Sequence, residues 1–351
     1  MPVPCTAEFD GSRAWMQAAM LDWLRLIRSS GLATIISNSL AAVFVAFFAG
    51  DGDRILWLAA RLKHNGTQVV WVLVASFLLY AAGMVWNDLI DVDRDRIGNP
   101  KRPLPDGRIG LVPAYVLGVL TVLGAVLAAL HVEYGFLLAG IVLSLALIYN
   151  LVAKSVPVLG SVVMGLTRAA HACFALLLLG PDYVRMVLTP AAGANQLHSG
   201  FVYPLILGTY IFGLTLISEM EERSRHGSRL AFIVGGACIA FSLLAAVGGL
   251  ATADWLRTLL HSGGIWPLAA VLAVLFALLC AGWLALTVGR AWFNALLTCR
   301  CDQVGRTVVA GLGGMILLDA VVASAAHPLG GLACAACYPI FLTVGKAIRM
   351  D

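Results

Sequence analysis

The sequence predicts an all-α membrane protein, and three observations support this fold class. Apolar residues make up 60% of the 351 residues, and charged residues make up only 12%. That charged fraction is about half the value of an ordinary soluble domain. The apolar residues gather in a series of stretches that are each long enough to cross a bilayer as a helix. We therefore expect a bundle of about nine transmembrane helices.

The expected spans follow one another along almost the whole chain. They cover residues 30–50, 67–86, 112–131, 133–150, 156–179, 201–218, 229–250, 265–288 and 307–326. A tenth apolar stretch, 331–347, is shorter, and we expect Pro339 to interrupt it. Residues 30–351 are thus predicted to form one transmembrane domain.

The segment before the first span, residues 1–29, is expected to have a separate role. Residues 14–28 read as an amphipathic helix that lies at the membrane interface. A simple cytoplasmic extension of the first span is an equal alternative. Residues 1–12 are polar and lack the basic start and apolar run of a cleavable signal.

Basic residues are distributed unevenly between the two predicted sides of the membrane. If the N-terminus is cytoplasmic, most of the 23 Lys and Arg residues fall in the loops on that side. This asymmetry follows the positive-inside rule, so the sequence predicts a multi-pass protein of the cytoplasmic (inner) membrane. Because the basic residues follow the loops and form no continuous stripe, no nucleic-acid partner is expected.

A cluster of acidic residues directly follows the second apolar stretch. Residues 87–95 read Asn-Asp-Leu-Ile-Asp-Val-Asp-Arg-Asp. On a helix, residues four apart share a face, which places Asn87, Asp91 and Asp95 together, with Asp88 beside them. Like charges this close repel one another unless a cation neutralises them. Several hard oxygen ligands suit Mg²⁺, which commonly holds a phosphate as well. The cluster therefore predicts a membrane enzyme that handles a diphosphate.

The loop after this cluster is expected to be rigid and basic. Residues 96–108 contain three prolines and two glycines, which favour a fixed, non-helical path. Lys101, Arg102 and Arg108 in this loop could stabilise negative charge on a departing phosphate group. The alternative is that they only anchor the loop at the membrane surface, a role that applies best to Arg108.

The order Asn87-Asp-x-x-Asp-x-x-x-Asp95, followed by Arg-Pro-Leu-Pro-x-Gly at 102–107, resembles the first signature of the UbiA superfamily of intramembrane prenyltransferases. The resemblance implies a helical bundle around a central cavity that opens to lipid. It also implies an isoprenyl diphosphate held through Mg²⁺ by two acidic motifs, and a small-molecule acceptor. Further positions that resemble family positions are Asn38, Tyr149, Lys154 and the segment 165–168.

The second acidic motif of the superfamily is altered in this chain. The resemblance places it in the loop 218–229, where Glu219 stands at one expected Asp position and Arg223 at the other. Glu221 and Glu222 are the nearest carboxylates that could compensate, and Glu219 with Glu222 is expected to hold a second Mg²⁺. The Glu-rich form resembles the EboC-like branch of the superfamily.

The resemblance and the residues together give each candidate a role. Loops 87–111 and 218–229 are expected to carry the active site, with the metal ligands Asn87, Asp88, Asp91, Asp95, Glu219 and Glu222. The expected catalytic residues are Asp88 and Asp91, which hold Mg²⁺, and Lys154 and Arg102, which neutralise charge on the departing pyrophosphate. Substrate binding is expected from Asn38, Asn87, Lys101, Tyr149, Arg168, His171 and Arg223.

Two polar residues of the fifth span have more than one interpretation. Arg168 and His171 lie three residues apart on one helix face. They could line the pocket of the acceptor, or they could satisfy buried groups and pair with Asp319 in the ninth span.

The sequence leaves the outcome of the reaction open. The isoprenyl cation could be transferred to an aromatic or quinone-precursor acceptor, or to a polar polyol or cyclitol. An intramembrane terpene cyclase would use the same metal–diphosphate chemistry. A transporter would also show many spans and intramembrane charge, but the sequence has at most a loose internal duplication. A catalytically silent member of the family is a further alternative, because Arg223 replaces an expected acid.

Overall fold

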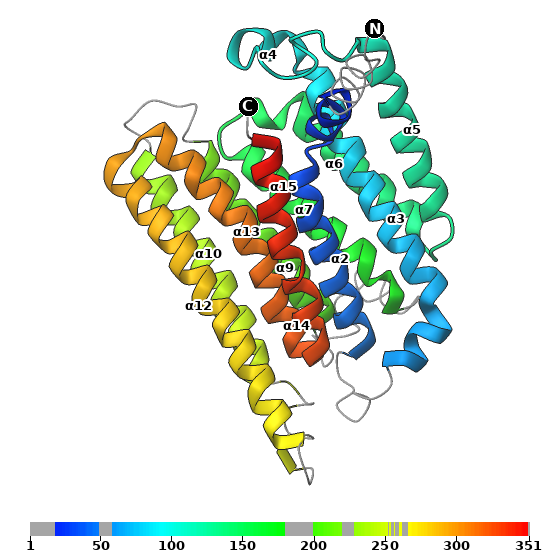
Figure 1. Cartoon of the computed structure of the whole chain (residues 1–351), viewed down its shortest axis with the longest axis vertical. Helices are drawn as coiled ribbons and strands as arrows, with labels where there is room; N and C mark the ends of the chain where they lie inside the picture. Colours follow the sequence, from blue (N-terminus) through cyan, green and yellow to red (C-terminus); the bar gives the residue numbers. More distant parts are fainter. Residues whose placement is uncertain are drawn as a thin grey trace, which may run out of the picture.

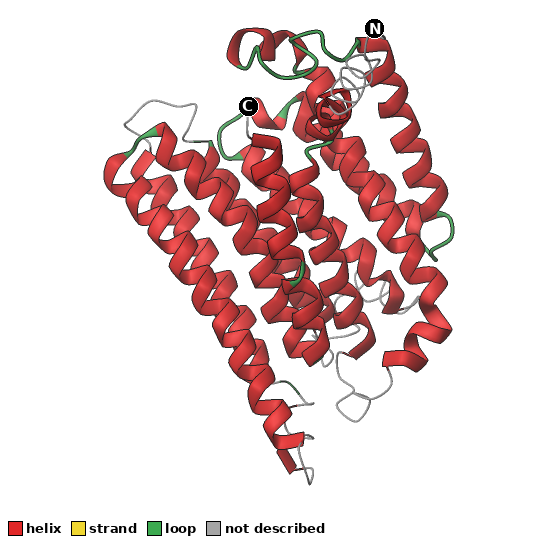
Figure 2. Ribbon diagram, viewed as in Figure 1, coloured by secondary structure: helices red, strands yellow, loops and turns green. Residues whose placement is uncertain are grey.

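The computed structural model describes residues 18–48, 58–179, 199–219, 228–251 and 266–349, with residues 253, 256, 260 and 261. All regular secondary structure in these residues is helical (Figure 2). In chain order the elements are α2 (Ser29–Phe48), α3 (Leu58–Ile90), α4 (Val92–Gly98), α5 (Leu111–Ala129), α6 (Gly135–Leu151), η2 (Ala153–Ser155), α7 (Leu159–Leu176), η3 (Leu177–Leu179), α9 (Ser199–Ser218), α10 (Ser228–Ala251), α12 (Trp266–Thr298), α13 (Cys301–Ala326), α14 (Pro328–Ala335) and α15 (Cys337–Arg349).

Most of these helices are suited to a bilayer. Within the described ranges, nine helical segments are long and apolar enough to cross a membrane, and Val202–Ser218 is apolar but shorter than these nine. Every apolar stretch marked in the sequence coincides with one of these helices, the tenth being divided between α14 and α15. The predicted all-α membrane bundle is therefore confirmed.

The helices form a buried centre and an outer layer. In α2, 83% of the span Gly31–Phe48 is buried inside the protein, and in α13 the share is 72%. The corresponding shares are 28% for α5 and 22% for the span that contains α6. Figure 1 shows α2 and α13 inside the bundle, with α5 on one flank and α10 and α12 on the other. The outer helices leave apolar side chains exposed, as expected for a surface that faces lipid.

Glycines allow very close contacts between neighbouring helices. A Cβ atom on Gly165 of α7 would lie 2.8 Å from the carbonyl oxygen of Gly208 in α9. A Cβ atom on Gly213 of α9 would lie 2.6 Å from the carbonyl oxygen of Gly235 in α10. Small residues at such crossings let backbones approach, which is how helices commonly associate in membranes.

The C-terminal apolar stretch breaks earlier than the sequence predicts. The helix is interrupted at Ala336, between α14 and α15, and Pro339 lies inside the first turn of α15. A proline has no N–H group and its ring clashes with the carbonyl group four residues earlier, so the helix before it must end at about Ala335. The first turn of a new helix tolerates the same proline.

A cluster of buried apolar side chains joins the segment before the first span to the end of the bundle where α3 is followed by α4. Residues 18–26 of this segment are helical, and residues 14–17 lie outside the described residues. The position of this helix at the membrane interface stays a prediction. Leu26 is fully buried among side chains from the end of α3 and the loop after α4, including Val85, Leu104 and Ile109. The N-terminal helix therefore packs on the loop that carries the basic residues.

Candidate active site

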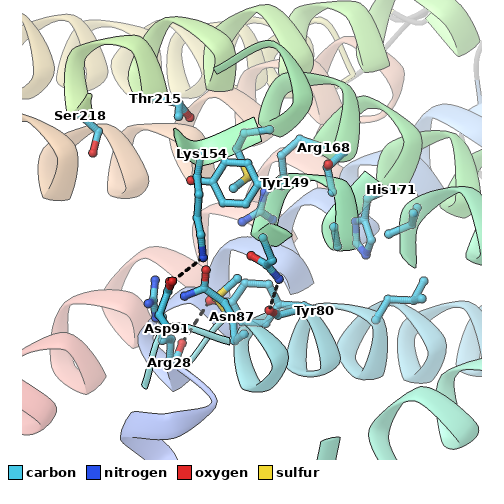
Figure 3. A pocket seen from close by; sticks show the side chains of 18 of the residues that line it. Arg28, Tyr80, Asn87, Asp91, Tyr149, Lys154, Arg168, His171, Thr215 and Ser218 are labelled. Atoms are coloured by element: carbon cyan, nitrogen blue, oxygen red, sulfur yellow. Dashed lines mark hydrogen bonds and ion pairs between the residues drawn. The ribbon is translucent and has the colours of Figure 1, made fainter. Parts of the chain in front are cut away.

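A cavity of about 430 Å³ opens where α3, α4, α6 and α7 meet. Its wall combines the acidic cluster with apolar side chains from the surrounding helices, among them Ile35, Leu79, Met84, Val142, Ala146 and Met164. Figure 3 shows Asp91, Asn87 and Lys154 toward one end, His171 toward the other, and Arg168 and Tyr80 between them. The space can thus hold a molecule with a charged end and an apolar remainder.

The acidic residues come together because helical hydrogen bonding continues across the junction of α3 and α4. The backbone N–H of Asp91 donates to the carbonyl oxygen of Asn87 at 3.0 Å, and that of Asp95 donates to Asp91 at 2.8 Å. Asn87, Asp91 and Asp95 therefore share a face and all line the cavity, as the spacing predicted. Asp88 is 5% exposed and lies beside them, with Asn87 Nδ2 donating to its Oδ1 atom at 3.2 Å.

Each carboxylate of this cluster is paired with a basic side chain. Arg102 Nη1 lies 2.5 Å from Asp95 Oδ2 and 3.8 Å from Asp88 Oδ1. Lys154 Nζ, carried by η2, donates to Asp91 Oδ1 at 2.6 Å. Charge-assisted hydrogen bonds of this kind keep like charges together at the edge of a membrane. The structure thus brings together the four residues to which the sequence assigned catalysis.

Arg28 is a further partner that the sequence did not single out. Its Nη2 atom lies 3.0 Å from Asp88 Oδ1. Burial lowers the pKa of Arg28, but its interactions with Asp88, Tyr80 and Tyr149 together outweigh burial, so the pKa lies above its ordinary value. Arg28 has a positive φ of 47° in the turn between the N-terminal helix and α2, a conformation that costs a non-glycine residue about 1 kcal/mol. Its place as the last basic residue before the first span is the one signal in the sequence that could have indicated it.

The loop after α4 is held by its own contacts and by the N-terminal helix. Arg108 binds Asp22 of that helix at 2.5 Å and Asp106 at 2.8 Å, and it donates to the carbonyl oxygen of Lys101. Arg108 therefore fixes the loop through contacts within the protein, and it is not among the residues that line the cavity. The side chain of Lys101 is exposed and also lies outside that lining.

Glu219 lines the cavity directly after α9, but both of its carboxylate oxygens are occupied by α7. Oε2 accepts from the backbone N–H of Val158 at 3.0 Å. Oε1 accepts from the backbone N–H of Ser161 at 3.0 Å and from its hydroxyl group at 2.6 Å. These contacts satisfy free N–H groups at the start of a helix. Val158 itself has a positive φ of 65°, a strained conformation for a β-branched residue.

The rest of the predicted second motif is not placed. Glu221, Glu222 and Arg223 lie outside the described residues. Of the two residues predicted to hold a second metal ion, the structure describes Glu219, and the role of Glu222 stays a prediction.

Three of the predicted substrate-binding residues lie deeper in the cavity. Tyr149, Arg168 and His171 all line it. The Arg168 guanidinium lies over the ring of Tyr80, 5.6 Å from its centroid. The hydroxyl group of Tyr80 in turn donates to the carbonyl oxygen of Arg28 at 3.3 Å. This contact joins the deep wall of the cavity to its acidic end.

Asn38 faces away from these residues. Its Nδ2 atom donates to Asp319 Oδ2 at 2.6 Å, and the hydroxyl group of Tyr203 donates to Asp319 Oδ1 at 2.9 Å. Asn38 and Asp319 are fully buried between α2 and α13, and neither lines the cavity. The structure thus gives Asp319 two hydrogen-bond partners in the core.

The donor chemistry of the acidic cluster fits Mg²⁺. Asn87, Asp88, Asp91 and Asp95 offer only oxygen ligands, which this ion prefers. Among the described residues, no group of three His, Cys, Asp or Glu side chains is close enough to hold a metal ion as it stands. The carboxylates point instead to Arg28, Arg102 and Lys154. A metal ion at this place would have to take over as their counter-charge.

Fold and site together define a class of protein: a multi-pass membrane protein whose cavity can take an anionic head at its acidic and basic end and an apolar chain within the bundle. The profile described as the UbiA prenyltransferase family matches residues 42–296. The chain belongs to the UbiA prenyltransferase family. Family membership does not favour the transporter alternative. The EboC-like branch stays a prediction.

Similar proteins agree with this assignment. The digeranylgeranylglyceryl phosphate synthase of Sulfurisphaera tokodaii is 31% identical over 118 residues, which cover 33% of this chain and 42% of that protein. The enzyme of the same name from Sulfolobus acidocaldarius is 32% identical over 180 residues, 48% of this chain and 58% of that protein. The chain thus matches less than two thirds of the length of these relatives.

A solved structure shows the same fold. The apo structure of a UbiA homolog from Aeropyrum pernix K1 superimposes with a TM-score of 0.52 and 18% sequence identity. The match covers 82% of this chain and 96% of the other. At this identity the likeness concerns the arrangement of the helices and not the substrate.

Proposed function

We propose that this protein transfers an isoprenyl group from an isoprenyl diphosphate to a small-molecule acceptor within the membrane, in a Mg²⁺-dependent reaction that releases pyrophosphate. One observation carries the proposal: Asp91 and Asp95, with Asp88 beside them, lie at one end of a cavity and are each paired with a basic side chain, and apolar side chains form part of the cavity wall. Such a site matches a molecule with a highly charged head and a hydrocarbon chain.

The basic side chains supply the charge that the leaving group needs. Arg28, Arg102 and Lys154 reach the site from three different segments of the chain. When an isoprenyl diphosphate enters, phosphate oxygens can replace the carboxylates as their partners, and each basic group then stabilises negative charge on the departing pyrophosphate. The apolar wall formed by residues such as Leu79, Val142 and Met164 keeps water from the allylic cation.

Mg²⁺ would be held by Asn87, Asp88, Asp91 and Asp95. When bound, the ion would neutralise the diphosphate and favour cleavage of its bond to carbon. The carboxylates that lose their basic partners to the phosphate would gain the ion in exchange, so no charge of the cluster is left unpaired.

The acceptor is the open part of this proposal. Aromatic or quinone-precursor acceptors and polar, polyol-type acceptors are both compatible with a cavity that carries Tyr149, Arg168 and His171. The names of two relatives contain a glyceryl phosphate, which lends support to the polyol type.

We also propose that the α4 end of the bundle faces the cytoplasm. Arg28, Arg94, Arg96, Lys101, Arg102, Arg108 and Lys154 belong to the segments at this end. The positive-inside rule favours the cytoplasmic side for such a concentration of charge. Labelling of a single added cysteine at Asp93, which is exposed, by a membrane-impermeant thiol reagent in sealed spheroplasts tests it. Labelling only after the membrane is opened is expected.

The function is tested by measuring pyrophosphate release from farnesyl and geranylgeranyl diphosphate. Purified protein in lipid nanodiscs is assayed with Mg²⁺ or with EDTA, and with or without a panel of aromatic and polyol acceptors. Release that needs both Mg²⁺ and an acceptor is the expected result. Release without any acceptor, with a cyclic hydrocarbon product, would instead identify a cyclase. The absence of release from either donor would contradict the proposal.

A further inference from the structure

A second hollow lies on the outside of the bundle, apart from the cavity that contains the acidic cluster. It is a groove between α12, α13 and α15, and its volume of about 430 Å³ equals that of the cavity. Figure 1 shows α13 between α12 and α15. The groove stays open because α15 packs mainly on α2. No residue lines both spaces, so the diphosphate chemistry of the cavity does not account for the groove.

Most of the groove is apolar. One face of α13 and the adjoining face of α15 supply this lining, which consists of Val309, Ala310, Gly313, Tyr338, Phe341 and Leu342. A Cβ atom on Gly313 would lie 3.1 Å from Cε1 of Phe341, so the glycine lets this ring pack against α13. Near the start of α15, Trp283 Nε1 donates to the hydroxyl oxygen of Tyr338 at 3.2 Å and joins α12 to α15. Aromatic side chains therefore bound the apolar end of the groove.

The opposite end of the groove is basic. Arg306 of α13 lines it directly. Arg290 follows three residues after Thr287, and Lys346 follows four residues after Leu342, and both of these reference residues line the groove. Residues three or four apart share a helix face. Three helices thus each bring one basic residue toward the same end of the groove.

These three basic residues carry positive charge that the protein does not neutralise. Among the described residues, no carboxylate forms an ion pair with Arg290, Arg306 or Lys346, and all three positions are exposed. The neighbouring Arg300 differs, because its Nε atom lies 2.9 Å from Asp302 Oδ1. The basic end of the groove can therefore accept an anion without first breaking an ion pair within the described part of the chain.

The basic end also lies near the boundary of the hydrocarbon layer. The candidate span Cys301–Ala326 has 26 residues, which corresponds to a length of about 39 Å. Since the hydrocarbon core of a bilayer is only about 30 Å thick, the ends of α13 extend toward the head groups. Arg306 lies in the second turn of α13, and its long side chain can reach the phosphate layer. The apolar lining then runs along the hydrocarbon layer.

We propose that this groove binds one phospholipid whose head group has a net negative charge. Arg290, Arg306 and Lys346 surround its phosphate, and an acyl chain lies along Val309 and Phe341. Basic pockets between transmembrane helices bind anionic head groups in this way. A lipid supplies both the anion and the chain parallel to the spans, whereas a helix of a second protein copy would cover the apolar lining without neutralising the basic end. The site is separate from the proposed prenyl transfer and does not depend on it.

The experiment measures lipid binding by native mass spectrometry. The full-length protein is freed of lipid in detergent and titrated with dioleoylphosphatidylglycerol or dioleoylphosphatidylcholine, which have the same chains and differ in the net charge of the head group. We expect one site that binds the phosphatidylglycerol at least about tenfold more tightly. Equal affinities would mean that the groove takes only the lipid of the general shell, and the proposal would fail.

Charge variants assign the preference to the groove. R306Q should weaken binding of the phosphatidylglycerol about fivefold, and the triple change R290Q/R306Q/K346Q should bring its affinity to within about twofold of that of the phosphatidylcholine. The matched control is R300Q, which removes the same charge from the same end of the bundle and should keep the full preference. Equal losses in R300Q and R306Q would attribute the preference to the overall charge of this end and overturn the proposal.

A variant that fills the groove tests the place of the acyl chain. A310F keeps all three basic residues and should lose most of the binding, whereas A285F, the same change at an exposed position of α12, should bind as wild type does. Unchanged binding in A310F would place the lipid elsewhere. The charge variants, at exposed positions, decide the question if A310F does not fold.

Two results would identify a different occupant and overturn the phospholipid assignment. One is displacement of the phosphatidylglycerol by an equal concentration of geranylgeranyl diphosphate in wild type and in D91N alike, which would make the groove a site for the isoprenyl diphosphate. The other is a dimer in the mass spectra that R306Q or A310F abolishes, which would make the groove an interface between two copies of the chain. A monomer with one bound phosphatidylglycerol is the expected species.

Discussion

The two acidic motifs of this chain are built in different ways. Asp88, Asp91 and Asp95 pair with the side chains of Arg28, Arg102 and Lys154. The charged group of each of these side chains stands at the end of a flexible hydrocarbon chain, so it can change partners. Glu219 instead accepts hydrogen bonds from two backbone N–H groups at the start of α7. Backbone donors of a helix cannot turn away. The first motif can thus exchange its counter-charges for a ligand, whereas in this structure Glu219 holds the start of a helix.

The difference teaches that a motif position and a ligand position are separate properties. Both motifs look alike in the sequence, as acids that directly follow an apolar span. Only the contacts distinguish a carboxylate held by replaceable cations from one held by the backbone. Four measurements can break or sharpen this contrast.

The largest expected effect comes from the first motif. Asp91→Asn leaves Lys154 without its carboxylate partner and removes a ligand charge, so pyrophosphate release should fall by about a thousandfold, while the protein still elutes as one species in detergent. The control is Asp93→Asn in the same motif, since the Asp93 side chain is 85% exposed and pairs with the exposed Arg96. A D91N variant with near wild-type activity would refute the metal assignment.

A smaller loss of activity is expected when the basic residue of one of these ion pairs is changed. Lys154→Gln removes one positive charge from the leaving group, so kcat should fall by about a hundredfold. Arg96→Gln, at an exposed position of α4, serves as the matched loss of charge and should leave kcat within about twofold. Equal effects of the two changes would mean that Lys154 acts only through the general charge of this face.

Glu219 should respond in stability and not in metal dependence. Glu219→Gln weakens hydrogen bonds to two N–H groups and one hydroxyl group, which should lower the free energy of unfolding by about 1–3 kcal/mol. The Mg²⁺ concentration for half-maximal activity should stay within about twofold. Glu133→Gln, in the exposed turn between α5 and α6, controls for loss of a carboxylate. A tenfold shift in the Mg²⁺ requirement would make Glu219 a metal ligand after all.

The smallest effect is expected when a single hydrogen bond to Glu219 at the start of α7 is removed. Ser161→Ala removes the hydroxyl group that donates to Glu219 Oε1 at 2.6 Å but keeps both backbone donors. Unfolding should become easier by about 1 kcal/mol, with activity unchanged. Ser242→Ala, whose hydroxyl group donates only to a carbonyl oxygen of its own helix, should have a smaller effect. Loss of activity in S161A at full stability would place Ser161 in the site.

The sequence predicted the helices and the first motif because both depend on local patterns. Apolar stretches mark the spans, and the four-residue spacing of Asn87, Asp91 and Asp95 survives the junction of α3 and α4. Contacts between distant segments were beyond such patterns. No spacing indicates that Arg28 meets Asp88, 60 residues later, or that Asn38 meets Asp319, 281 residues later.

The turn at Arg28 has a consequence for how the protein is made. Arg28 is synthesised before any span, yet its partner Asp88 follows only at the end of α3, so this part of the active site cannot exist until two hydrophobic helices have left the ribosome. Shortening the chain to begin at Ser29 would keep every membrane crossing intact. It would nevertheless strip a buried carboxylate of one counter-charge, so a protein that inserts normally should be defective as a catalyst.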